Sequence, residues 1–197
     1  DSGDRREFST GAVRDVNETK GRCDLLPLKQ IGEFLDSSAR NVEFTEGYII
    51  SLIDEFIRSG EIGYLKVAVQ AFIRYAYSDD KYTAILELSK HYAEGAKKYE
   101  ERNWEKGIPL HCFIDSSMRH YLKFLRGDND EAHNRAFLWN IFGALWTIEE
   151  IHNGNLPKEL EDLPYVHPER KKGKDIMSED FEAFWREQAL ERLNGQG

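Results

Sequence analysis

A stretch of polar residues at 91–107, HYAEGAKKYEERNWEKG, carries side chains that can do chemistry. Glu87, His91, Glu94 and Lys98 are spaced i, i+4, i+7 and i+11, which places them on one face of a helix. Glu94 is a candidate metal ligand and Lys98 a candidate phosphate contact; the alternative is a solvated face whose charges pair along the helix. The guanidinium of Arg102, the amide of Asn103 and the indole of Trp104 follow directly in the sequence. Together these groups are the ones that a site for a metal-bound nucleotide needs.

A second group of polar residues lies at 115–120. Asp115 and Arg119 are four positions apart, and His120 comes next. On a helix such an acid–base pair is usually a weak surface pair, which is the alternative to a role in binding.

The segment GDNDEAH at 127–133 contains three carboxylates within four positions: Asp128, Asp130 and Glu131. His133 follows one turn after Asp130. Clustered carboxylates suit a hard cation such as Mg²⁺, which usually keeps several of its waters. Acids at the start of a helix also complement its dipole, so this segment has a purely structural explanation as well.

Asn140 interrupts the apolar run AFLWNIFGALW. A buried amide must find hydrogen-bond partners, so Asn140 bonds a neighbouring helix or recognises a ligand. On a helix it shares a face with Asp130 and His133.

Residues 1–24 are polar and contain several glycines. They form a disordered arm, or an extended one in which arginine side chains hold phosphate. The arginines proposed for phosphate contact are Arg5, Arg6 and Arg14.

The composition restricts the class of protein. The chain has 197 residues, 40% of them hydrophobic, and a net charge of −9. An acidic chain without a long basic run is not expected to coat a nucleic-acid polymer, but it can bind small phosphorylated ligands. Cys23 and Cys112 lack metal-site spacing, and we interpret them as reduced thiols of a cytoplasmic protein. No apolar run approaches the roughly 18 residues of a membrane span.

The hydrophobic spacing predicts an all-α fold, a bundle of about five to seven helices with an extended N-terminal arm. The domains expected are the arm at 1–24, a helical nucleotide-binding domain at 25–165, and a linker with a last helix at 166–197. The helix at 81–100 is expected to turn Tyr82, Ile85, Leu86, Tyr92 and Tyr99 inward. The other helices are expected after Leu25 and at 45–59, 61–77, 110–125, 130–152 and from Ser178.

Several segments together resemble the phage-encoded dATP/dGTP diphosphohydrolase N-terminal family, which is associated with the MazG-like all-α nucleotide pyrophosphohydrolases. The resemblance covers residues 1–36 and about 87–164, and the helical hairpin at 45–77 reads as an insertion between these blocks. The matching segments are STGAVRD (9–15), KGRCDLLP (20–27), GAKKYEERNWEKG (95–107), DSSMRHYLKFLRGDNDEAH (115–133) and the AFLWN helix.

The resemblance implies cleavage of a purine deoxynucleoside triphosphate (dGTP or dATP) between its α and β phosphates, with Mg²⁺, or Mn²⁺, as cofactor. It also implies a homodimer or larger homo-oligomer, located in the host cytoplasm if the protein is phage-encoded. The implied metal ligands are Glu94, Asp115, Asp128, Asp130 and Glu131, and the implied catalytic residues are Glu94, Glu131 and His133. The implied substrate contacts are Lys98, Arg102, Asn103, Trp104, Arg119, His120, Asn140, Arg5, Arg6 and Arg14, with Trp104 stacking on the purine.

The chain departs from the acidic motif of MazG-like enzymes, Glu-Glu-x-x-Glu on one helix and Glu-x-x-Asp on another. Glu94 has no acidic partner at the required offsets, and Asp128-x-x-Glu131 has the second spacing with the acids exchanged. Two alternatives therefore accompany the enzyme: a non-catalytic protein that binds or sequesters a nucleotide, and a helical protein that contacts a host partner through 45–77.

Overall fold

Five long helices form the body of the molecule. The computed structural model describes residues 5–7, 13–15, 23–28, 30–31 and 46–164. The segment 166–197, with the helix predicted from Ser178, lies outside these residues, as does most of the arm. The helices confirm the all-α class: α2 (Glu46–Ser59), α3 (Ile62–Tyr77), α4 (Lys81–Lys98), α5 (Leu110–Arg126) and α6 (His133–His152).

Short elements complete the described fold. Strands β1 (Arg5–Glu7) and β2 (Val13–Asp15) pair antiparallel in the N-terminal arm. No strand was predicted there, because three paired residues are too few to show an alternating pattern. Three 3₁₀ turns occur at η1 (Cys23–Leu25), η2 (Asn103–Lys106) and η3 (Lys158–Leu160).

A local hydrogen bond explains where α4 begins, and the start of α6 differs from the expected position. The Asp80 carboxylate caps α4 by accepting a hydrogen bond from the Thr83 backbone N–H at 3.0 Å. Helix α6 begins at His133 and not at residue 130, so Asp130 and Glu131 lie in the loop that precedes it.

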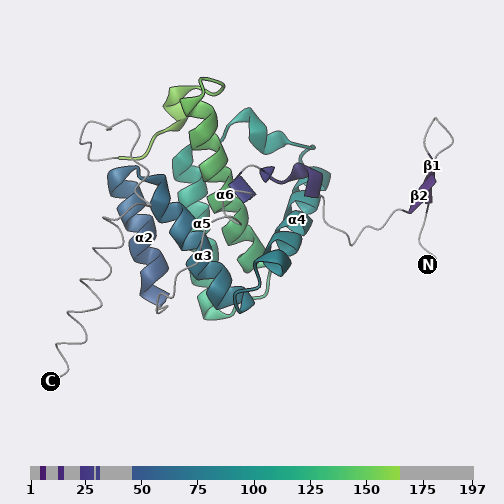
Figure 1. Cartoon of the computed structure of the whole chain (residues 1–197), viewed down its shortest axis with the longest axis horizontal. Helices are drawn as coiled ribbons and strands as arrows, with labels where there is room; N and C mark the ends of the chain where they lie inside the picture. Colours follow the sequence, from purple (N-terminus) through teal and green to yellow (C-terminus); the bar gives the residue numbers. More distant parts are fainter. Residues whose placement is uncertain (1–4, 8–12, 16–22, 29, 32–45, 165–197) are drawn as a thin grey trace.

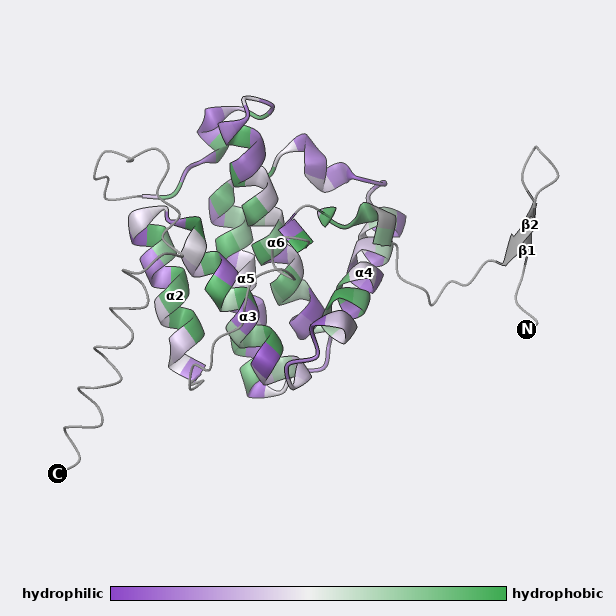
Figure 2. Cartoon of the chain, viewed as in Figure 1, coloured by the Kyte–Doolittle hydropathy of each residue, from purple (hydrophilic) through white to green (hydrophobic). Residues whose placement is uncertain are grey.

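Helix α6 is the centre of the bundle. It packs against α3, α4 and α5, while α2 packs on α3 and touches α5 (Figure 1). Most of its residues are buried, whereas hydrophilic and hydrophobic residues alternate along the surrounding helices (Figure 2). Among the described residues, no helix combines the length and the apolar character that crossing a bilayer requires.

The expected inward face of α4 is wrong for three of its five residues. Tyr82, Leu86 and Tyr99 are 67%, 58% and 66% exposed, whereas Tyr92 is buried and Ile85 is partly buried against the core. Tyr82 and Leu86 each lie two positions before a buried residue of α4, Ala84 and Leu88. Because residues two positions apart on a helix point about 200° apart, Tyr82 and Leu86 face away from the side that meets α6. The buried face of α4 consists of Ala84, Leu88, Ser89 and Tyr92.

Helices α5 and α6 approach closely at Gly143. A Cβ atom at this position would lie 2.5 Å from Cε1 of Phe113, a buried side chain of α5. Glycine is therefore required here by space and not by backbone conformation, in contrast to Gly107, whose φ is +98°.

We expect Gly143→Ala to destabilise the fold. Overpacking a core costs about 1–3 kcal/mol, and the better helix propensity of alanine offsets about 1 kcal/mol of this. Urea unfolding should show a lower midpoint. The matched control is Gly95→Ala in α4, where nothing lies within 4 Å of the added Cβ; this variant should be as stable as the parent or more so. Equal stability of the two variants would contradict the close approach.

Candidate functional site

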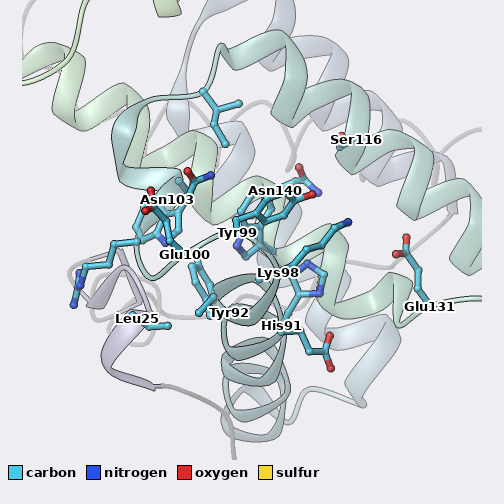
Figure 3. Close-up of a pocket in the computed structure, with 17 residues that line it drawn as sticks. Leu25, His91, Tyr92, Lys98, Tyr99, Glu100, Asn103, Ser116, Glu131 and Asn140 are labelled. Atoms are coloured by element: carbon cyan, nitrogen blue, oxygen red, sulfur yellow. The ribbon is translucent and has the colours of Figure 1, made fainter.

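A cavity of about 440 Å³ lies between α4, the segment 99–108, α5 and α6 (Figure 3). Glu131 and Ser116 are at one end of it, Leu25 and Asn103 are at the other, and Lys98 lies between (Figure 3). The structure thus brings together seven of the residues predicted from the sequence: Glu94, Lys98, Arg102, Asn103, Trp104, Glu131 and Asn140.

Other predicted residues lie near the cavity without lining it. The Arg119 guanidinium donates to Ser116 Oγ at 2.8 Å, and Ser116 lines the cavity. Arg119 is therefore close to the wall on its α5 side. The side chains of the arginines at 5, 6 and 14 lie outside the described part of the structure, so their role in phosphate binding stays a prediction.

Aromatic side chains make up much of the cavity wall, and the sequence argument missed most of them. Tyr92, Tyr99 and Trp139 line it together with Trp104. The Trp104 ring meets Tyr92 edge-on at 5.5 Å and Trp146 edge-on at 4.7 Å. Tyr99 and Trp139 could have been found from their positions beside Lys98 and Asn140.

Trp104 belongs to the core as much as to the cavity. It is 7% exposed, and its Nε1–H has no hydrogen-bond partner among the described residues. Tyr99 is 66% exposed, with the Lys98 ammonium 5.0 Å from its ring centre. Of these two rings, Tyr99 therefore has the free surface for stacking, while Trp104 supports the wall.

Glu94 lines the cavity but is paired with a cation. Its Oε1 lies 3.2 Å from Nη1 of Arg135 on α6, a residue the sequence argument did not select. The Arg135 side chain is 16% exposed, whereas that of Glu94 is 60% exposed.

Most of the predicted Mg²⁺ ligands are paired with cations, although the Asp128 and Asp130 carboxylates lie within 4.8 Å of each other. Asp128 accepts a hydrogen bond from Arg126 at 2.7 Å, and Asp130 accepts one from Lys123 at 2.8 Å. Asp115 pairs with Arg119 at 2.9 Å on the exposed surface of α5. Since four of the five carboxylates are paired with four different cations, this set does not fit a single Mg²⁺ ion.

The imidazoles of His120 and His133 converge on the carboxylate of Glu131. His120 Nδ1 lies 3.0 Å from His133 Nδ1 and 2.9 Å from Glu131 Oε1. His133 Nδ1 is 3.4 Å from the same oxygen, and its Nε2 is 2.7 Å from Asp130 Oδ1. The sequence argument selected all four residues but did not predict that the two imidazoles touch.

The electrostatics of this cluster keep Asp130 charged and His120 neutral. Hydrogen bonds from Lys123 and then from His133 lower the pKa of Asp130 to about 2. Burial lowers the pKa of His120, and although the Glu131 carboxylate opposes this, the neighbouring His133 adds to it.

Asn140 is buried, and its Nδ2 donates to the Ala136 carbonyl oxygen of its own helix at 2.8 Å. This bond is neither to a neighbouring helix nor to a ligand, the two alternatives that the sequence left open. Because Asn140 also lines the cavity, recognition of a ligand stays a prediction.

A separate trio joins α5 to the segment after η3. His111 Nε2 lies 3.2 Å from Cys112 Sγ, and the other ring nitrogen of His111 contacts the Asp162 carboxylate. None of the three lines the cavity. The sequence argument assigned them no role, although His111 and Cys112 are adjacent.

Comparison with known proteins gives one match. Residues 74–155 match the model of the family described as dATP/dGTP diphosphohydrolase, N-terminal. Every residue named as lining the cavity lies in this range except Leu25. The match excludes the first block of the resemblance, at 1–36, and nearly all of the hairpin. No curated protein and no solved structure gives a match.

We expect the fold to lose stability as the pH falls through the ordinary pKa of histidine because of His91. Burial lowers the pKa of His91, and Glu94 only partly opposes this. Below about pH 6.5 the unfolded chain therefore binds this proton more readily than the folded chain does, which favours unfolding.

Urea unfolding between about pH 7.5 and about pH 5.5 measures this effect. His91→Gln should flatten the pH dependence, whereas His152→Gln, at an exposed position, controls for the loss of an imidazole. The same slope in His91→Gln and in the parent protein would contradict this assignment.

Proposed function

We propose that this chain, whose residues 74–155 match the model of the dATP/dGTP diphosphohydrolase N-terminal family, hydrolyses a purine deoxynucleoside triphosphate to the monophosphate and pyrophosphate. One observation carries the proposal. The matched segment, together with Leu25, lines a cavity of about 440 Å³. Its wall has aromatic side chains, the cations Lys98 and Arg102 and the carboxylates of Glu94, Glu100 and Glu131. Cavities of about 300–1,000 Å³ are typical of small-molecule sites.

The aromatic part of the cavity suits the base. Tyr99 and Trp139 offer ring surfaces, and base stacking is sequence-tolerant and favourable in water-exposed sites. The Asn103 side chain is close enough to line the same space and can hydrogen-bond the edge of a purine.

The cationic part suits the phosphates. Lys98 lies between Tyr99 and Glu131 (Figure 3). The Arg119 guanidinium donates a hydrogen bond to Ser116, which lines the cavity. An ammonium and a guanidinium neutralise the charge of a triphosphate and hold it in a fixed direction. A nucleotide with its base at Tyr99 would then place its triphosphate towards Glu131.

Hydrolysis needs a water molecule activated at that end. The water oxygen bonds to phosphorus, the bond to the oxygen that bridges the α and β phosphates breaks, and pyrophosphate leaves. Glu131 lines the cavity and is within hydrogen-bond reach of His120, so these two groups can take up the proton of the water. Because four of the five predicted Mg²⁺ ligands are paired with cations, we assign no step to Mg²⁺ held by the protein; Mg²⁺ enters here with the triphosphate.

We expect incubation with dGTP or dATP and Mg²⁺ to yield monophosphate and pyrophosphate, separated by ion-exchange chromatography. Release of single phosphates would contradict the proposed bond cleavage.

The pairing of Glu94 with Arg135 favours one alternative, a protein that binds the nucleotide without cleaving it. An intact nucleotide that raises the melting temperature would establish that alternative.

Tyr99→Ala should weaken nucleotide binding about tenfold or more, since stacking on one aromatic ring contributes about 1–3 kcal/mol. Isothermal titration with a non-hydrolysable dGTP analogue measures the change. Tyr82→Ala is a matched control, because Tyr82 lies on α4 with a nearly equal exposed fraction, 67% against 66%, but does not line the cavity. Equal losses in both variants, or none in Tyr99→Ala, would place the base elsewhere.

A further inference from the structure

We propose that His120, His133 and Glu131 form a binding site for one divalent transition-metal ion of the Mn²⁺, Co²⁺ or Zn²⁺ class at the wall of the cavity. The three atoms concerned are His120 Nδ1, His133 Nδ1 and Glu131 Oε1. This site differs from the carboxylate set expected for Mg²⁺ both in its donors and in the ion it selects.

The distances between the three atoms are those of ligands around one ion. They are 3.0 Å between the two nitrogens, and 2.9 Å and 3.4 Å from these nitrogens to the oxygen. Ligands about 2.1 Å from an ion, at angles of about 90–110°, lie about 3.0–3.4 Å from one another. The side chains therefore need little movement to coordinate an ion.

Asp130 sets the tautomer that a metal ligand needs. Its ionised carboxylate accepts a hydrogen bond from Nε2 of His133, so the neutral imidazole keeps its lone pair on Nδ1. That nitrogen points at His120 Nδ1, and the His133 side chain is only 1% exposed. A carboxylate that holds the far nitrogen of a ligating histidine is a usual second layer of metal sites.

The donor set determines the class of ion. Two imidazoles with one carboxylate suit transition-metal ions, whereas Mg²⁺ prefers oxygen ligands and dehydrates reluctantly. Three protein ligands leave positions open for water or substrate, and Glu131 also lines the cavity. When bound, the ion would lower the pKa of a coordinated water, which is the chemistry that the proposed hydrolysis requires.

A second group of possible ligands, Asp128, Asp130 and His133, is less suitable. Arg126 and Lys123 already donate to its two carboxylates, so a cation there would displace two salt bridges. In the group formed by His120, His133 and Glu131, the contacts of the described residues include no hydrogen bond from a lysine or an arginine to Glu131.

The test uses the full chain, freed of any affinity tag and stripped with a chelator, without nucleotide. Co²⁺ binding is followed by visible absorption, and Co²⁺, Zn²⁺ and Mg²⁺ are compared by isothermal titration. We expect one Co²⁺ per chain, bound at least about tenfold more tightly than Mg²⁺. Because no nucleotide is present, failure of the proposed hydrolysis would leave this result unaffected.

Variants locate the ion. His120→Gln should weaken Co²⁺ binding at least about tenfold, and Asp130→Asn about 10–100-fold through the orientation of His133. Asp130 is exposed, so its variant is expected to fold even if changes at the buried imidazole are not tolerated. His111→Gln is the matched control, because His111 also contacts a carboxylate but lies outside the cavity.

Three results would overturn the proposal. The first is a folded parent protein, verified by circular dichroism, that binds no Co²⁺. The second is unchanged binding in both His120→Gln and Asp130→Asn. The third is loss of binding in His111→Gln with retention in His120→Gln, which would place the ion at the trio of His111, Cys112 and Asp162.

Discussion

The burial of α6 is the constraint on which the rest of the structure depends. This helix packs against three others, and Gly143 lets Phe113 of α5 approach its backbone. On a helix enclosed on most sides, most polar groups find hydrogen-bond partners. Asn140 does so within its own helix, and His133 does so through Asp130 and His120.

The cavity follows from this arrangement. Helix α4 packs against α6, and the segment after α4 turns Trp104 into the core while leaving Tyr99 exposed. The space between carries a lysine at mid-length and a carboxylate at one end. Most other acidic and basic side chains nearby form ion pairs with each other. The group that can still supply metal-ligand atoms consists of Glu131, His120 and His133.

Much of the helical fold was predictable from the sequence, because one-sided hydrophobic spacing is a local property. The helices at 46–59 and 62–77 begin within one residue of the expected positions. The inward face of α4 was predicted incorrectly, since tyrosine and leucine occur on both sides of that helix. Its true buried face uses Ala84 and Ser89, whose small side chains give little hydrophobic signal.

The sequence by itself determined the helical class, the similarity of residues 74–155 to the matching family model and seven of the residues that line the cavity. Only the tertiary structure decided which acids are available. Glu94 and Asp128 are neutralised by Arg135 and Arg126, and the first of these pairings joins residues on different helices. Spacing along one helix reports which side chains share a face, but charge pairing and imidazole contact between helices depend on packing, which no local pattern encodes.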